Sequence, residues 1–319
     1  MDAGDRVTLM LENSIEYVSL LLGVWAAGAV AVPLNADTTG EAASKTLAHA
    51  RPRLVAARAR AVDRLGLRGT GLRILEIGPR FSAFRERLEG LAPAEVAEVR
   101  ESEPAMLLYT SGTTGAPKGV VLSHANLLAN TRSIVEYLRL NGSDSIVNVL
   151  PFFHSFGNSV LLTHLAAGAR VVIENRFAFP AKVVETMQRE RPTGFAGVPA
   201  TYYILLHRSH FADHNWEFLR YICQAGGGMR VETIERLRKI MPATEIVIMY
   251  GQTEASARLS YLPPAMLERK LGSIGIGIPG VELKVAGEDG RELPAGETGE
   301  LLARGPNVML GYADDPEAT

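Results

Sequence analysis

The stretch LLYTSGTTGAPKGVVLSH, residues 107–124, decides the fold because an apolar run leads directly into a loop of glycine, hydroxyl and lysine residues. The loop residues that can contact an anion are Thr110, Ser111, Gly112, Thr113, Thr114, Gly115, Lys118 and Gly119. Hydroxyl groups donate hydrogen bonds, glycines bring backbone N–H groups close to an anion, and a lysine adds charge. The pattern predicts a phosphate-binding loop that follows a strand.

This loop differs from a Walker A loop, which requires Ser or Thr directly after the lysine. Here Lys118 is followed by Gly119 and the apolar run 120–122, so we expect a strand to leave the loop. If only the glycine, threonine and serine residues are considered, the alternative to a phosphate-binding loop is a glycine-rich hairpin turn.

The complete string resembles the signature of the adenylate-forming superfamily: acyl-CoA synthetases, peptide-synthetase adenylation domains and luciferases. The resemblance implies that the loop binds the β- and γ-phosphates of ATP. A second motif of that family is YGxTE, and the chain has Tyr250, Gly251, Gln252, Thr253 and Glu254. By resemblance, the tyrosine ring lies against adenine, the threonine meets the α-phosphate, and the glutamate holds Mg²⁺, with Thr114 as a further metal candidate. The catalytic candidates are Lys118, Thr253 and Glu254.

Two segments resemble the parts of the family that line the acyl site. PFFHSFGN, residues 151–158, resembles PxFHxxG, and AGGGMR, residues 225–230, stands where the family has a GGAPL-like wall beside adenine and the acyl group. The second segment departs from the pattern, since Met229 replaces the usual proline. The resulting acyl-pocket candidates are His154, Phe156, Gly157, Asn158, Val198, Gly227, Gly228 and Gly251, and Gly226, Gly227 and Gly228 are also nucleotide candidates. From the residues alone, a lone histidine among aromatic side chains indicates a hydrogen-bonded core residue, and three glycines also suit a simple turn.

Apolar runs alternating with amphipathic stretches predict an α/β fold with parallel sheets covered by helices. The expected strands are 29–33, 54–57, 73–77, 105–110, 119–122, 146–150, 170–174, 194–197, 220–224 and 245–249. The expected helices include 125–138, 181–191 and 231–241. The resemblance implies two packed αβ sheets in five layers, αβαβα, over residues 1–271, and the start of a distorted β-barrel over 272–319. It also implies that a leading segment and the C-terminal domain lie outside this chain, which is then the large N-terminal domain, able to bind ligands but nearly inactive alone.

Composition excludes several other classes of protein. The 319 residues carry a formal net charge of −2, which gives no reason to expect a nucleic-acid partner. The uncharged stretch 17–34 is as long as a short membrane span, but its glycines and Pro33 favour a buried helix followed by a strand. The single cysteine, Cys223, cannot form an internal disulfide, and we expect a cytoplasmic protein with this residue in its core.

The resemblance is greatest to stand-alone AMP-forming acyl-CoA ligases. It implies ATP-dependent conversion of a carboxylic acid to an acyl-adenylate, followed by thioester formation with CoA, with Mg²⁺ as cofactor. One alternative is an adenylation domain that loads the thiol of a carrier protein. Another, from a different class, is a catalytically silent module that binds a nucleotide or an acyl group.

Overall fold

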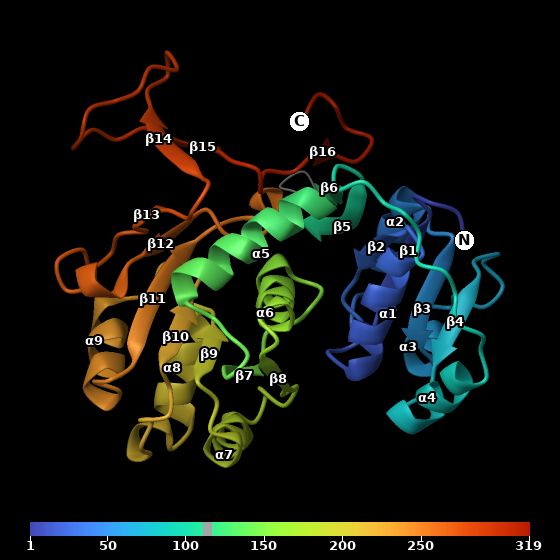
Figure 1. The fold of residues 1–319 in the computed structure, drawn as a ribbon, viewed down its shortest axis with the longest axis horizontal. Helices are drawn as coiled ribbons and strands as arrows, with labels where there is room; N and C mark the ends of the chain where they lie inside the picture. Colours follow the sequence, from blue (N-terminus) through green and yellow to red (C-terminus); the bar gives the residue numbers. More distant parts are fainter. Residues whose placement is uncertain (111–116) are drawn as a thin grey trace. The chain divides into compact units, whose positions relative to one another are not determined.

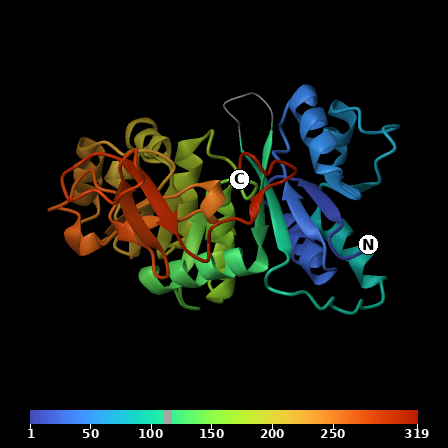
Figure 2. The same cartoon turned by 90° about the horizontal axis from the view of Figure 1, so that it is seen from above.

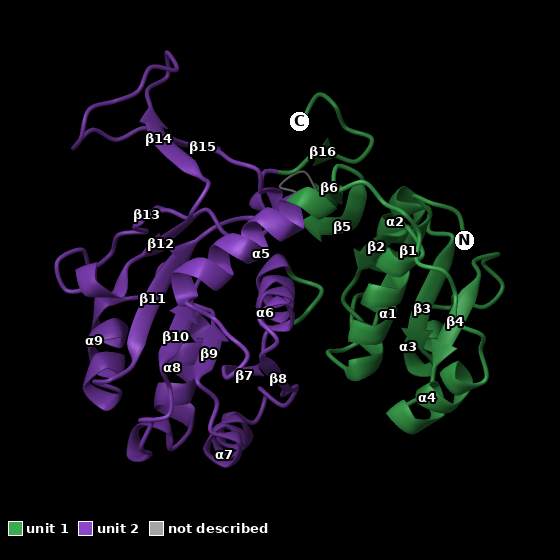
Figure 3. Ribbon diagram, in the orientation of Figure 1, with its two compact units in different colours: residues 1–125, 151–154, 309–319 green, residues 126–150, 155–308 purple. Residues whose placement is uncertain are grey.

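The computed structural model describes residues 1–110 and 117–319 and divides the chain into two compact units (Figure 1, Figure 3). Unit 1 contains residues 1–125, 151–154 and 309–319, and unit 2 contains residues 126–150 and 155–308. Residues after 271 are thus shared between the units, and the domain division at residue 271 stays a prediction.

Unit 1 is built on a seven-stranded sheet with the order β16-β6-β5-β2-β1-β3-β4. Its strands are β1 (Arg6–Met10), β2 (Val30–Pro33), β3 (Leu54–Arg58), β4 (Ile74–Ile77), β5 (Pro104–Thr110), β6 (Lys118–Ser123) and β16 (Gly311–Tyr312). Its helices are α1 (Ile15–Ala26), α2 (Gly40–Ala50), α3 (Ala59–Arg64) and α4 (Phe81–Glu89). Strands β1 to β5 run parallel, whereas β6 and β16 are antiparallel to their neighbours.

Helices cover both faces of the first sheet (Figure 2). On one face, Leu47 of α2 and Val62 of α3 pack against Val32 and Val55 of the sheet. Helix α1 packs against β1 and β2 and also contacts α4. Strands covered on both faces are mostly apolar, as β2 shows, which explains why apolar runs identified most of them in the sequence.

Unit 2 is built on a second seven-stranded sheet with the order β13-β12-β11-β10-β9-β7-β8. Its strands are β7 (Ser145–Asn148), β8 (Arg170–Ile173), β9 (Gly194–Gly197), β10 (Tyr221–Gln224), β11 (Glu245–Tyr250), β12 (Ser260–Leu262) and β13 (Ile276–Gly277). Its helices are α5 (His124–Leu138), which begins in unit 1, α6 (Ser155–Ala166), α7 (Pro180–Glu190), α8 (Pro199–Arg208) and α9 (Val231–Ile240). Strands β7 to β11 are parallel, and β12 and β13 are antiparallel additions.

The second sheet also lies between two layers of helices. Residues of α7, α8 and α9 share one core cluster with Phe195 and Ile222 of the sheet. Residues of α5 and α6 share another cluster with Ala196 and Cys223, which point to the opposite face. The cysteine is a buried core residue, as expected.

The two expected αβ sheets are therefore confirmed, as are all ten expected strands and the three expected helices, with no end displaced by more than two residues. After residue 271 the described strands form no closed barrel: β13 extends the second sheet, β16 extends the first, and β14 (Glu282–Ala286) pairs only with β15 (Glu300–Arg304). The uncharged stretch 17–34 is helix α1 followed by β2, as expected. No described helix has the length and apolar character needed to cross a membrane.

Candidate active site

Strands β5 and β6 form an antiparallel hairpin in unit 1, with Thr110 opposite Lys118 at the end that adjoins the connecting loop. This confirms that a strand, and not a helix, follows the loop. The predicted phosphate-binding residues Ser111, Gly112, Thr113, Thr114 and Gly115 lie outside the described residues. Lys118 is half-buried, and its Nζ lies 5.2 Å from the centre of the Tyr312 ring, a cation–π contact that holds the ammonium group near the hairpin end.

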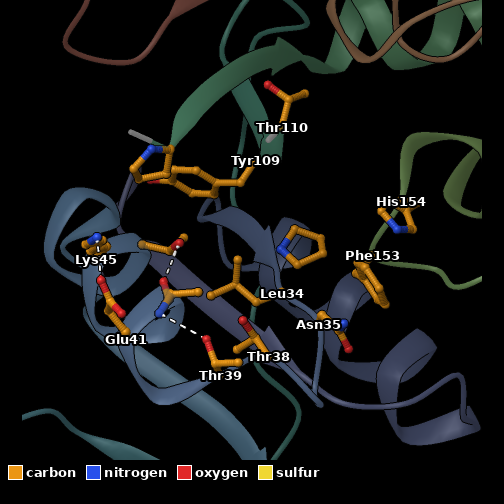
Figure 4. A pocket seen from close by; sticks show the side chains of 14 residues that line it. Leu34, Asn35, Thr38, Thr39, Glu41, Lys45, Tyr109, Thr110, Phe153 and His154 are labelled. Atoms are coloured by element: carbon orange, nitrogen blue, oxygen red, sulfur yellow. Dashed lines mark hydrogen bonds and ion pairs between the residues drawn. The ribbon is translucent and has the colours of Figure 1, made fainter. Parts of the chain in front are cut away.

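A cavity of about 510 Å³ opens beside Thr110 in unit 1 (Figure 4). Polar and aromatic side chains line it, including Asn35, Thr38, Thr39, Lys45, Tyr109, Phe153 and His154. The Tyr109 hydroxyl lies 2.8 Å from His49 Nδ1, and burial raises the pKa of Tyr109 to about 12. Thr110 and His154 therefore lie in the cavity among neutral polar groups. The charge of Lys45 is paired, since its Nζ lies 2.7 Å from Glu41 Oε1.

His154 ends a short segment whose backbone is held by buried side chains of unit 1. The N–H of Phe152 donates to Asn13 Oδ1 at 2.7 Å, and the Tyr17 hydroxyl donates to the Phe152 carbonyl at 3.3 Å. The His154 ring packs at 4.4 Å from Phe153 and stays largely exposed. Partial burial lowers the pKa of His154 below its ordinary value, so its imidazole is neutral at pH 7. Its role at the acyl site stays a prediction.

In unit 2, most of the remaining candidates follow three adjacent parallel strands at their carboxyl ends. Val198 follows β9, Gly226 to Gly228 follow β10, and residues 250–254 end and follow β11. Because these strands are neighbours with the same direction, their carboxyl ends share one edge of the sheet, where ligands of α/β proteins bind. The sequence candidates of unit 2 are thus brought together at this edge.

Side-chain contacts tie the candidate segments of this edge to one another. Ser155 Oγ, at the start of α6, lies 3.4 Å from Thr253 Oγ1, which places the first turn of α6 beside the YGQTE motif. Phe156, Gly157 and Asn158 belong to the same turn of α6. Gln224 Nε2 donates to the Gly227 carbonyl at 2.6 Å and fixes the glycine segment, whose residues are exposed at the edge.

The loop after β11 is held by a residue that the sequence analysis did not identify. Asn307 is 1% exposed, and its Nδ2 donates to the carbonyls of Ala255 at 3.0 Å and of Arg258 at 2.8 Å. Its own carbonyl accepts a hydrogen bond from Ser256 Oγ at 2.8 Å. Asn307 lies in the stretch GELLARGPNVMLGY, residues 299–312, for which no role was predicted.

Arg258 is a second residue that sequence reasoning missed. Its guanidinium carbon lies 4.1 Å from the centre of the Phe156 ring, and the residue is only 2% exposed. Its position four residues after Glu254, directly after the small residues 255–257, was the available signal.

Glu254 supplies the carboxylate that the metal prediction requires. It lies in a 3-10 turn, Thr253–Ala255, directly beyond the end of β11, and is half-buried. Within the described ranges, no group of three or more histidine, cysteine or acidic residues could hold a metal ion. Mg²⁺ is usually bound by one or two carboxylates together with substrate phosphates, so the Glu254 carboxylate fits this ion.

Comparison with known proteins identifies the family to which a chain with these two sheets and this site belongs. The chain matches the AMP-binding enzyme family over residues 1–313 and belongs to that family. It is 31% identical over 318 residues to an indoleacetate–CoA ligase of Aromatoleum aromaticum, covering 96% of this chain and 61% of that protein. It is likewise 31% identical over 332 residues to 4-coumarate–CoA ligase 3 of Arabidopsis thaliana, covering 99% and 59%.

A solved structure of a long-chain-fatty-acid–CoA ligase from Archaeoglobus fulgidus superimposes with a TM-score of 0.89 at 27% identity, covering 98% of this chain and 65% of that one. The chain therefore spans about three fifths of the length of the curated relatives, from 59% to 61%.

Proposed function

We propose that this chain binds ATP and a carboxylic acid and activates the acid as an acyl-adenylate, as the core of an AMP-forming carboxylate–CoA ligase. The observation that carries the proposal is the convergence of Tyr250–Glu254, Gly226–Gly228 and the first turn of α6 at the carboxyl edge of β9, β10 and β11. A flat purine requires a close approach of backbone, which exposed glycines permit. A phosphate requires hydroxyl donors, which Thr253 supplies.

The reaction consists of two displacements. In the first, an oxygen of the substrate carboxylate attacks the α-phosphorus of ATP, and the bond to the bridging oxygen breaks to release pyrophosphate. In the second, a thiolate sulfur attacks the acyl carbonyl carbon, and the bond to the adenylate oxygen breaks to release AMP. A carboxylate is already nucleophilic at neutral pH, so the protein has to align it and stabilise charge on the phosphates.

The residues of the chain divide these tasks among them. We assign Thr253 as the donor to the α-phosphate and Lys118, with the loop before it, as the positive group for the β- and γ-phosphates. Glu254 and a nucleotide phosphate would hold Mg²⁺, which would neutralise part of the phosphate charge. His154, being neutral at pH 7, is assigned to shaping the acyl site and not to proton removal.

The test is calorimetric binding of a non-hydrolysable acyl-sulfamoyl adenosine to the folded 319-residue chain, combined with acid-dependent pyrophosphate release. We expect micromolar binding and only slow pyrophosphate release, because the chain alone is expected to be nearly inactive. Glu254→Gln should abolish the Mg²⁺ dependence of that slow release without changing the melting temperature. Glu235→Gln, at an exposed position of α9, is the matched control and should leave both properties unchanged. Absence of binding by folded protein at millimolar ligand would refute the proposal.

The acceptor thiol and the location of the protein are also proposals. The relatives named above are CoA ligases, which favours CoA over a carrier-protein thiol. We infer a cytoplasmic location from the single cysteine, which is buried and can form no disulfide within the chain. Comparing CoA with a thiol-loaded carrier protein as acceptor of the same adenylate would decide the first point.

A further inference from the structure

Arg258 is held by its backbone at the carboxyl edge of the second sheet. Its carbonyl accepts hydrogen bonds from Asn130 Nδ2 at 3.0 Å and from Asn307 Nδ2 at 2.8 Å. The Arg258 backbone also lies against Gly251, because a Cβ at position 251 would be 2.8 Å from Arg258 Cα. The Cα atom of Arg258 is therefore fixed directly beside the YGQTE motif.

The guanidinium group is buried without the partners that a buried charge requires. Among the residues that the structure describes, Nε and Nη1 of Arg258 have no hydrogen-bond acceptor, and the hydrogen bond that joins its side chain to Tyr137 brings no negative charge, because burial raises the pKa of that tyrosine. The Phe156 ring at 4.1 Å supplies a cation–π contact. Such a contact contributes about 0.5–2 kcal/mol, whereas removing an unpaired ion from water costs several kcal/mol. The site is therefore incomplete without an anion.

The neighbours of the guanidinium group show what kind of anion would fit. Its charge opposes the rise that burial causes in the pKa of Tyr137 and of the Cys223 thiol, so it lies close to both side chains. Cys223 belongs to the apolar cluster on the face of the sheet that α5 and α6 cover, and both Tyr137 and Phe156 pack against that cluster. A nucleotide triphosphate needs several donors and ions around it, which this apolar setting lacks. A single carboxylate matches a guanidinium fork in shape and charge.

We propose that Arg258 is a specificity-determining residue that binds a second carboxylate of the acid substrate, so that the chain selects a dicarboxylic acid. The inference rests on the proposed function, because Phe156 and Gly251 are assigned to the acyl pocket on that basis. One carboxylate of the substrate then reacts at the α-phosphate, and the other, at the far end, pairs with Nε and Nη1 of Arg258. A site with a buried donor strongly rejects an analogue that lacks the acceptor, since the donor is left unpaired.

The decisive probes are acyl-sulfamoyl adenosines in pairs that differ only at the end of the acyl chain. Each pair has an ω-carboxylate and the matching ω-amide, and acyl chains of three to six carbons cover the unknown depth of the pocket. By calorimetry we expect one chain length at which the carboxylate binds at least about 100-fold more tightly than the amide, since two charge-assisted hydrogen bonds are involved. Arg258→Met should reduce this preference to within about threefold, and Arg258→Lys should retain roughly a tenfold preference.

Melting temperatures separate a role in recognition from a role in folding. Arg258→Met removes an unpaired buried charge and keeps the length of the side chain, so we expect the melting temperature to rise by roughly 2–6 °C. Arg220→Met is the matched control, because Arg220 donates to Asp144 Oδ1 from Nε at 3.2 Å and from Nη2 at 2.9 Å. That variant should lower the melting temperature and leave the carboxylate-to-amide preference unchanged.

The outcomes distinguish this inference from the proposed function. If the wild-type chain binds carboxylate and amide equally at every chain length, or if Arg258→Met weakens both equally, the inference is wrong and the proposed function stands. If the folded wild-type chain binds neither probe of any pair, both fail. Two results together would support the inference and the proposed function: Arg258→Met loses the preference for the carboxylate probe, and Glu254→Gln weakens binding of the carboxylate and amide probes equally.

Discussion

Replacing Gly251 with alanine should displace the loop that carries Thr253, Glu254 and Arg258. A Cβ at position 251 would lie 2.0 Å from the Ala257 carbonyl oxygen, 2.7 Å from its carbon and 2.8 Å from Arg258 Cα. All three are backbone atoms, so no rotation of a side chain relieves the contact. Since Cβ contacts below 3.0 Å are essentially never found, the loop has to move by about 1 Å.

The energetic consequence can be worked out from the contacts of this loop. Overpacking of this kind costs about 1–3 kcal/mol. The same movement strains two hydrogen bonds, Leu259 N–H to the Tyr250 carbonyl at 2.9 Å and Ala257 N–H to the Gln252 carbonyl at 3.2 Å. Each contributes about 0.5–1.5 kcal/mol. Alanine also restricts the unfolded chain, which offsets about 0.4–1 kcal/mol of this loss. We therefore expect a net loss of about 1–6 kcal/mol in the free energy of unfolding.

Gly228→Ala is the matched control, because it is also a candidate glycine of this edge but a Cβ there would meet nothing within 4 Å. Urea unfolding followed by fluorescence of the buried Trp216 reports on unit 2. We expect a lower midpoint for Gly251→Ala and an unchanged midpoint for Gly228→Ala, whose effect should be confined to binding of acyl-sulfamoyl adenosine. Equal midpoints for the wild type and Gly251→Ala would refute the reasoning about the loop.

Three further expectations concern unit 2. Asp144→Asn should lower the free energy of unfolding by about 3–5 kcal/mol, because it leaves Arg220 without its charge partner. Burial alone would raise the pKa of Asp144, but its hydrogen bonds lower that pKa overall. The stability that the Asp144 carboxylate contributes is therefore present above pH 4 and is lost as the pH falls through the lowered pKa of the folded state, which urea midpoints from pH 7 to 3 would measure. Asn307→Leu should cost about 2–4 kcal/mol, because it removes the donor to the Ala255 carbonyl, and an unchanged urea midpoint would contradict this. Thr253→Val should weaken binding of acyl-sulfamoyl adenosine about 10- to 100-fold in calorimetry at an unaltered melting temperature.

The sequence predicted the parallel strands well because their physical signal is local. A strand buried on both faces is often apolar along its whole length, as in β2 and β9, and no partner has to be known to recognise it. Strand β1, Arg6–Met10, was not predicted as an element, since it follows a polar start and includes the buried Thr8. The short strands β12, β13 and β16 were also missed, because only pairing with distant segments defines them: Gly311 pairs with Val121.

The candidate site was predicted in part for a related reason. Motif resemblance identified the YGQTE residues and the glycines after β10, and the structure places them at one edge of the sheet. Asn307 and Arg258 were not identified, because the importance of a buried polar side chain depends on what surrounds it. In the sequence, Asn307 is one asparagine in a glycine- and proline-containing stretch, and Arg258 is one of many arginines.

The loop after β11 departs from the local rules that the rest of unit 2 follows. Ser256 has φ 56° and Ala257 has φ 105°, conformations that cost a non-glycine residue about 1–3 kcal/mol each. Arg258 adds a buried charge whose Nε and Nη1 have no acceptor among the described residues. Elsewhere in unit 2 a comparable charge, Asp144, is fully compensated by Arg220, Thr193 and a backbone N–H. The charge of Asp144 is thus compensated within the fold, whereas Nε and Nη1 of Arg258 remain available to a ligand. A ligand that supplied the missing acceptor would remove the part of this cost that comes from the buried charge, whereas the backbone cost at Ser256 and Ala257 would remain.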